Sequence, residues 1–151
     1  MSDHGQVLST LNELIETCKD GQEGFRQAAE GVKNGELKTL FLTYAQQRAQ
    51  FAGELQAEVR RLGGDPETTA STVGALHRGW MNLKAALAGA DEGAIISECE
   101  RGEDAAVSAY ESALTAGLPQ DVREIVARQA AQVREAHDRI RALERASGRG
   151  A

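Results

Sequence analysis

The sequence predicts an all-α protein, a bundle of four long helices, on three observations. Only 4% of residues are aromatic, so the side chains that β-strands prefer are scarce, whereas helix formers such as Ala, Leu, Glu, Gln and Arg dominate. Proline occurs only at Pro66 and Pro119, so few positions forbid a helix. Apolar residues recur at steps of three and four, which is the spacing of one buried helix face. The length of 151 residues fits a single domain spanning residues 1–151.

Turn and capping residues set the expected ends of the helices. Asn34-Gly35 is expected to cap the end of a first helix, with a second helix following almost at once. Asp91 is typical of a helix N-cap, and Pro119 is tolerated in the first turn of a helix. The four long helices are therefore expected at about residues 5–34, 36–63, 91–116 and 119–146. The tail, residues 147–151, is expected to fray.

A long crossover, residues 64–90, joins the second and third of these helices. Leu76, Trp80, Leu83 and Leu87 recur in it at helical spacing, which predicts a short extra helix at about residues 74–89. Trp80 is expected to anchor this segment to the bundle. Two helix pairs with tight turns and one long crossover are typical of the ferritin-like variety of four-helix bundle. In that arrangement the second and third long helices run parallel.

Charge and composition exclude several classes of protein. The net charge of −6 and the isoelectric point near 5.1 argue against binding of nucleic acid, which needs a basic surface. No apolar run is long enough to span a membrane, and the N-terminus lacks the features of a secretion signal. The two cysteines, Cys18 and Cys99, do not form a disulfide framework and lie on apolar rows, so we expect them buried and free. These features predict a soluble, cytoplasmic protein.

Residues 98–110, ECERGEDAAVSAY, place four carboxylates within seven positions. At about 100° per residue, Glu103 points into the bundle with the apolar row. Glu98 and Asp104 point outward, and Glu100 lies on the flank. We therefore expect three of these carboxylates to be solvated and one to be buried.

Each long helix carries one polar residue near the middle of its apolar row. These residues are Gln22, Arg48, Glu103 and Gln129, with Gln132 as an alternative that fits the height better but faces about 60° off the row. Counted in residues from the connections between the helices, Gln22, Arg48 and Glu103 lie at the same height along the bundle. Gln129 lies one to two helical turns away from that height. A buried carboxylate is costly unless it is paired, and arginine offers a two-pronged partner. The sequence thus predicts a Glu103–Arg48 ion pair bracketed by glutamines, which adds little net stability but fixes the register of the helices.

A dinuclear metal centre is the usual alternative in such a bundle, but the residues it needs are missing. That centre requires a Glu from each of two helices and Glu-x-x-His from the other two. The chain has no E-x-x-H, and its histidines, His4, His77 and His137, lie off the inward rows. Neutral amides cannot replace anionic ligands, and a guanidinium in the layer repels a cation. We therefore favour no cofactor.

Two other functions stay open at this point. One is a metal-binding redox protein that holds iron or manganese through Glu100, Glu103 and His137. The other is a small-molecule binder with a central cavity around Ala29, Ala106 and Ala136.

Glycines inside the expected helices suggest close contacts with other elements. Gly24, Gly31 and Gly53 face away from the apolar rows. Each lowers helix stability by about 1 kcal/mol relative to alanine. These glycines would have a function if they allowed close approach of the crossover or of a second subunit. We therefore predict a homodimer.

Several motifs together resemble a bacterial family of small four-helix-bundle proteins of unknown function in the ferritin-like superfamily. The resemblance spans about residues 6–146. It rests on Leu11-Asn12-x-Leu14-Ile15-Glu16 with Asp20-Gly21 and Phe25, on His77-Arg78-x-Trp80, on Glu100-Arg101-Gly102-Glu103-Asp104 with Tyr110, and on Leu118-Pro119 followed by His137-Asp138. It implies the paired-helix fold and brings no established reaction. We expect a non-enzymatic protein, a stress-related or partner-binding module.

Overall fold

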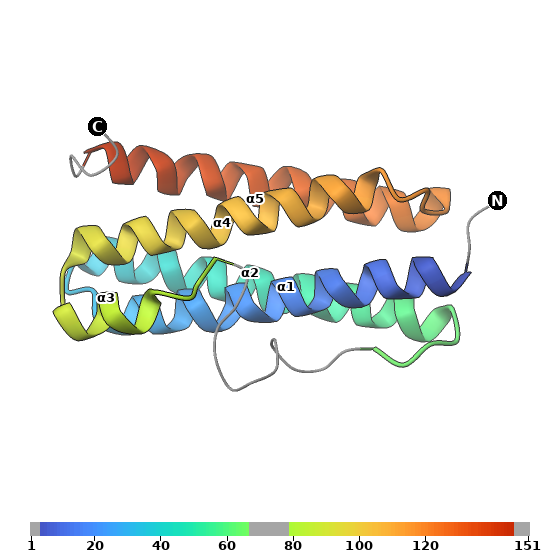
Figure 1. Ribbon diagram of the computed structural model, residues 1–151, viewed down its shortest axis with the longest axis horizontal. Helices are drawn as coiled ribbons and strands as arrows, with labels where there is room; N and C mark the ends of the chain where they lie inside the picture. Colours follow the sequence, from blue (N-terminus) through green and yellow to red (C-terminus); the bar gives the residue numbers. More distant parts are fainter. Residues whose placement is uncertain (1–3, 67–78, 147–151) are drawn as a thin grey trace.

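The computed structural model describes residues 4–66 and 79–146. These residues form five α-helices and no strand (Figure 1). The helices are α1 (His4–Gly31), α2 (Gly35–Arg61), α3 (Leu83–Gly89), α4 (Glu92–Leu114) and α5 (Gln120–Ala146). Each of the four long helices extends about 35–42 Å at 1.5 Å per residue.

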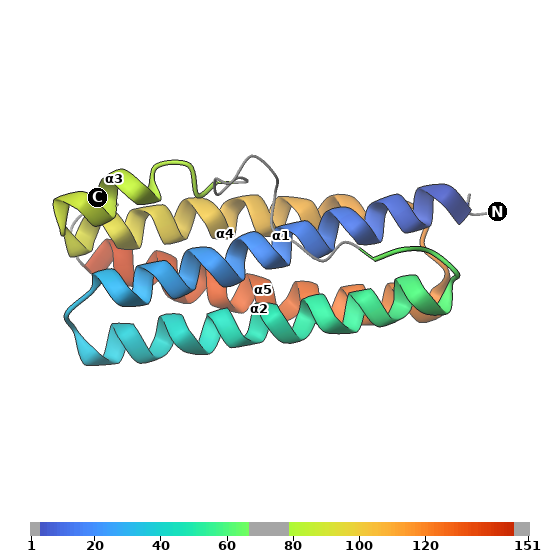
Figure 2. The same ribbon diagram turned by 90° about the horizontal axis from the view of Figure 1, so that it is seen from below.

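The long helices form two antiparallel hairpins that pack into one bundle. α1 pairs with α2, α4 pairs with α5, and the hairpins meet mainly along α1 and α4 (Figures 1 and 2). α2 and α4 run in the same direction, as a ferritin-like crossover requires. The predicted all-α, ferritin-like fold class is thus confirmed.

Capping residues start two of the long helices. The Asn34 side chain accepts hydrogen bonds from the backbone N–H groups of Glu36 and Leu37. Asn34 is therefore the N-cap of α2, and the prediction that it caps the end of the preceding helix is wrong. The Asp91 side chain caps α4 by accepting from Gly93 and Ala94. A carboxylate at this position also interacts favourably with the helix dipole.

The crossover contains a shorter helix than the predicted range of 74–89. Within the described residues, α3 begins at Leu83 and ends at Gly89, and positions 79–82 form a turn before it. The first part of the predicted range, residues 74–78, lies outside the described residues. Ala90 follows α3 in the left-handed region, with φ 53° and ψ 28°. A single residue, Ala90, therefore separates the end of α3 from the Asp91 cap of α4.

Glycines on α1 and α4 receive the crossover. The Trp80 side chain is 2% exposed and lies against Gly24 of α1 and Gly102 of α4, where an added Cβ atom would overlap the indole ring. Gly31 receives Leu87 in the same way. Trp80 is thus an anchor, and close approach of the crossover explains two of the three predicted glycines. Gly53 has no atom within 4 Å of an added Cβ, and the homodimer stays a prediction.

The apolar core consists of two clusters. One lies at the end of the bundle where α1 begins, and the other lies at the end covered by α3. Each draws on all four long helices, with Leu11, Leu55, Ala106 and Val126 in the first cluster and Phe25, Phe41, Ile96 and Ile140 in the second. Buried polar side chains lie between the clusters. In the described part of the chain, no helix combines the length and the apolar character needed to cross a membrane.

Candidate functional site

A bidentate ion pair between Arg48 of α2 and Glu103 of α4 forms the centre of the buried polar layer. Nη1 and Nη2 of Arg48 each lie 2.6 Å from one carboxylate oxygen of Glu103. The side chains are 1% and 0% exposed. Charge-assisted, two-pronged bonds of this kind are among the strongest in proteins. The pair joins one hairpin to the other.

The surroundings of Arg48 leave its guanidinium little freedom. Gly21 of α1 lies against it, since a Cβ added at Gly21 would be 3.3 Å from Nη1. The guanidinium carbon is 5.5 Å from the centre of the Phe25 ring, within the range of a cation–π contact. Burial alone would lower the pKa of Arg48, but the charge and hydrogen bonds of Glu103 raise it above its ordinary value. The arginine is therefore charged in the folded protein.

A chain of hydrogen bonds extends from the same layer toward the surface. The Tyr110 hydroxyl donates to Oε1 of Gln129 at 2.7 Å. Its oxygen lies 3.1 Å from the sulfur of Cys18, and because the hydroxyl proton is already used, the thiol is the donor. Nε2 of Gln129 donates to Oε1 of Glu54 at 2.8 Å and to the Phe51 carbonyl at 3.4 Å. The chain therefore links α1, α4, α5 and α2.

The thiol and the phenol in this chain are neutral at physiological pH. Burial raises the pKa of Cys18 to about 11. Burial also raises the pKa of Tyr110 well above its ordinary value, and neighbouring Cys18 raises it further. A thiol needs a lowered pKa to act as a nucleophile. This layer is therefore not arranged for nucleophilic catalysis.

The predicted glutamines have different positions in the structure. Gln129 is fully buried and lies at the height of Tyr110, two turns along α4 from Glu103. Gln22 is half-buried, and in the described part of the chain no hydrogen bond joins it to the ion pair. Gln132 is exposed, so its assignment to the buried layer is wrong. It lies next to the inward-facing Val133 and therefore points off the buried face of α5.

Three members of the layer were missing from the sequence-based site. Cys18 lies on a predicted apolar row, and Tyr110 follows the inward Glu103 by seven residues, which puts it on the same helix face. Their mutual contact depends on the relative heights of α1 and α4. Glu54 is half-buried beside the row and is also paired with Arg128 at 3.1 Å. A tyrosine on an inward row is the one signal that could have indicated a buried hydrogen-bond partner.

The acidic stretch 98–104 is less solvated than predicted. Glu98 is 4% exposed, and its carboxylate accepts the backbone N–H of Asn82 at 3.1 Å. The prediction that Glu98 faces water is wrong, because the crossover covers that side of α4. Arg101 lies 3.2 Å from the same carboxylate and pairs with it.

The residues of the alternative metal site point in different directions. Both carboxylate oxygens of Glu103 face Arg48. His137 lies 2.6 Å from Asp104 through Nε2 and 3.1 Å from Asp138 through Nδ1. Burial raises the pKa of Glu100, and hydrogen bonding to Glu144 raises it further. Glu100, Glu103 and His137 are therefore not brought together.

The side chains in the middle of the bundle also do not fit the dinuclear metal centre that ferritin-like bundles can carry. Such a centre needs several carboxylates to neutralise two cations, whereas a guanidinium and an amide occupy the middle of this bundle. Among residues 4–66 and 79–146, no group of three or more His, Cys, Asp or Glu side chains could hold a metal ion.

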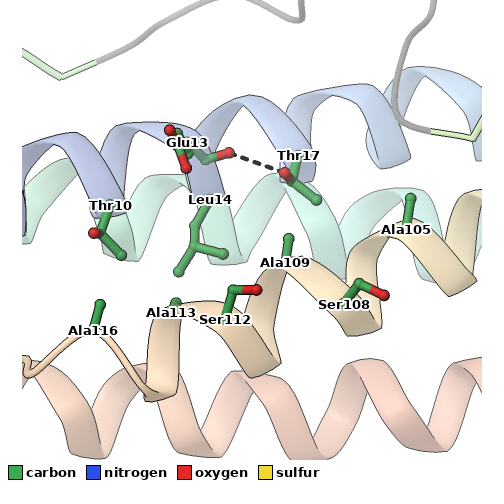
Figure 3. A pocket seen from close by; sticks show the side chains of 10 residues that line it. All are labelled: Thr10, Glu13, Leu14, Thr17, Ala105, Ser108, Ala109, Ser112, Ala113 and Ala116. Atoms are coloured by element: carbon green, nitrogen blue, oxygen red, sulfur yellow. Dashed lines mark hydrogen bonds between the residues drawn. The ribbon is translucent and has the colours of Figure 1, made fainter.

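A groove of about 460 Å³ lies between α1 and α4. Figure 3 shows Leu14 and Thr10 of α1 facing a row of small side chains on α4, with Glu13 beside them. The other side consists of Ala105, Ser108, Ala109, Ser112 and Ala113 of α4, with Ala116 just after the helix. The predicted central cavity around Ala29, Ala106 and Ala136 is a different place, and all three side chains are buried.

Comparisons with known proteins agree with this fold. A model of the family described as "Domain of unknown function (DUF2383)" matches residues 6–116. No curated protein matches the chain significantly. Among solved structures, a mutant of Dps1 from Mycobacterium smegmatis matches with a TM-score of 0.74 and 11% sequence identity, over 95% of this chain and 99% of that one. At this identity the likeness shows the fold alone. The family match confirms the predicted resemblance to a family of unknown function, and the structural match confirms the predicted bundle fold.

Proposed function

The chain belongs to the family described as "Domain of unknown function (DUF2383)", and we propose that it is a non-enzymatic, partner-binding helical bundle. In this proposal the polar layer of Arg48, Glu103 and Gln129 occupies the place where related folds carry metal ligands. Its role is to fix how the two hairpins pair. Buried ionic groups contribute little net stability but can specify register and partner choice.

The observation that carries the proposal is the fully buried, bidentate contact between Arg48 and Glu103. It uses both oxygens of Glu103, a fully buried carboxylate that could otherwise be a ligand. The raised pKa values of Cys18 and Tyr110 support the non-enzymatic part, since neither side chain is ionised at neutral pH.

Metal content tests this part of the proposal. The protein would be produced in medium with iron and manganese, purified without added metal and analysed by elemental mass spectrometry. Thermal unfolding would then be compared with and without Fe(II), Mn(II) or Zn(II). We expect metal well below one equivalent and an unchanged Tm. Stoichiometric iron or manganese, or a Tm that rises on addition of metal, would contradict it.

The groove between α1 and α4 supports the partner-binding part. Small side chains leave space there for an inserted side chain or helix, and the exposed Glu13 beside it adds a negative charge. The variant Ala109→Arg would fill the floor of the groove. Ala127→Arg, on the exposed face of α5, is the matched control. A partner held by wild type and Ala127→Arg but lost from Ala109→Arg is the expected result, and equal retention by both variants would contradict it.

A further inference from the structure

The segment that follows the undescribed part of the crossover, residues 79–90, packs as a separate strap across α1 and α4. We propose that this strap is a latch that opens at Ala90 while the four-helix bundle stays folded. Three features of the described residues support this: one dominant anchor, a helix too short to persist alone, and a strained hinge.

The anchor is Trp80. Its indole ring occupies the slot between Gly24 and Gly102 and meets Phe25 edge-on, with 5.1 Å between the ring centroids. Besides this apolar contact, the strap is tied to α4 by the hydrogen bond from the Asn82 N–H to Glu98. Gly79, at φ +96°, lets the backbone lie directly against the carbonyl of Arg101. The strap's largest apolar contact and its side-chain hydrogen bond to α4 therefore lie within its first four residues.

The helix within the strap depends on this anchor. α3 has seven residues, whereas isolated helices shorter than about 12–15 residues are marginal in water. Leu83 is the one buried residue of α3, and Leu87 contributes a half-buried contact at Gly31. Loss of the Trp80 contact leaves α3 with the Leu83 and Leu87 contacts alone, too few for a seven-residue helix, so the strap is expected to dock and undock as a unit.

The hinge is Ala90. It is the one non-glycine residue with positive φ in the described part of the chain. An L-residue in this region is disfavoured by roughly five- to thirtyfold in population. Ala90 is exposed, so its side chain gains little burial that could offset the strain. When the strap leaves, Ala90 can relax to the right-handed conformations that L-residues prefer, which relieves this strain.

Opening has a defined consequence for the bundle. It empties the indole-sized slot between α1 and α4 and uncovers the edge of Phe25, whose ring lies against Arg48. The strap is thus the outer cover of the aromatic contact that borders the buried ion pair.

Hydrogen exchange of the full-length protein, resolved by residue, tests the latch. We expect amides of residues 84–89 to exchange faster than buried amides of α1 and α4. Ala90→Gly removes the backbone strain and should slow the exchange of the strap about fivefold. Ala90→Val increases the strain and should speed it by about fivefold or more. Neither variant should change the exchange of the buried amides in α1 and α4.

The sole tryptophan provides a second readout of the same variants. Acrylamide quenching of Trp80 should follow the order Ala90→Val, wild type, Ala90→Gly, from most to least quenched. Ala127→Gly on exposed α5 is the matched control, and it should weaken the bundle without slowing the strap. Strap amides that exchange at the rate of the buried bundle amides, or Ala90 variants that move strap and bundle alike, would overturn the proposal.

Discussion

Arg48 and Glu103 depend on each other because both charges are out of reach of water. Removing one partner strands the other, so Arg48→Ala is expected to lower the free energy of unfolding by about 3–5 kcal/mol. Urea unfolding followed by circular dichroism measures this loss. An unchanged transition midpoint would show that Glu103 finds another partner or that water reaches it.

The double variant Arg48→Met with Glu103→Leu is the matched control for that experiment. It removes both charges together and fills the space with apolar groups. Replacing a whole buried ion pair in this way is often neutral or stabilising. We therefore expect the double variant to be more stable than Arg48→Ala, although it carries one more substitution.

Tyr110 holds the second half of the polar layer, where its hydroxyl contacts both Gln129 and Cys18. Tyr110→Phe leaves the buried Gln129 oxygen without its donor, which is expected to cost about 1–3 kcal/mol. Tyr44→Phe is the control, since the Tyr44 side chain is half-buried and has no such network. The Tm values of the two variants are compared by thermal unfolding. A larger loss for Tyr110→Phe than for Tyr44→Phe would be due to the buried hydrogen bond and not to the loss of a hydroxyl alone. Equal Tm values would contradict the role given to Tyr110.

At the scale of the helix, periodicity predicted which residues face inward and could not predict what covers the outside. The steps of three and four correctly turned Arg48 and Glu103 toward the core, because the angle between positions on one helix is fixed. The prediction placed Glu98 in water, whereas the crossover covers it in the structure. The spacing of residues along one helix does not show which other segment packs against its outer face. Gln132 was misplaced because it matched the height of the layer but not the buried face of its helix.

The α4–α5 contact contains a histidine whose charge depends on pH. Burial lowers the pKa of His137, but Asp138 and Asp104 outweigh it, and the pKa is raised above 6.5. The folded state therefore favours the protonated ring. Its contribution to stability is fully present below pH 6.5 and is lost as pH rises through the folded pKa.

His137→Asn should remove this dependence. Urea midpoints measured between about pH 5 and 8 should fall with pH more steeply for wild type than for the variant. The difference is expected to stay under about 1 kcal/mol, because both aspartates are largely exposed. Parallel curves would contradict the assignment of the proton to His137.

Glycines in two long helices have opposite roles, which a pair of variants can separate. Gly102→Ala places a methyl group into the space of the Trp80 indole and is expected to cost about 1–3 kcal/mol. Gly53→Ala meets no atom within 4 Å and should stabilise α2 by about 1 kcal/mol. Thermal unfolding should thus show Tm shifts of opposite sign. A rise in both would mean that the crossover adapts without cost.

At the scale of the whole molecule, the two apolar clusters could have been two folding units, since a polar layer lies between them. Their composition argues against this, because each cluster takes side chains from α1, α2, α4 and α5. Neither hairpin can leave without exposing both clusters, and the long helices run through both. We therefore predict a single cooperative unfolding transition for residues 1–151.

Calorimetry tests this with one substitution in each cluster. Leu55→Ala lies in the first cluster and Phe41→Ala in the second, and each should cost about 2–5 kcal/mol by leaving a cavity. If the clusters unfold together, both variants lower the midpoint of one transition whose calorimetric and van't Hoff enthalpies agree. If the clusters unfold separately, each variant lowers the unfolding temperature of its own cluster alone, and the calorimetric peak splits in two. Opening of the strap alone would not produce such a split, because α3 and its turn carry too little of the buried surface to give a separate heat peak.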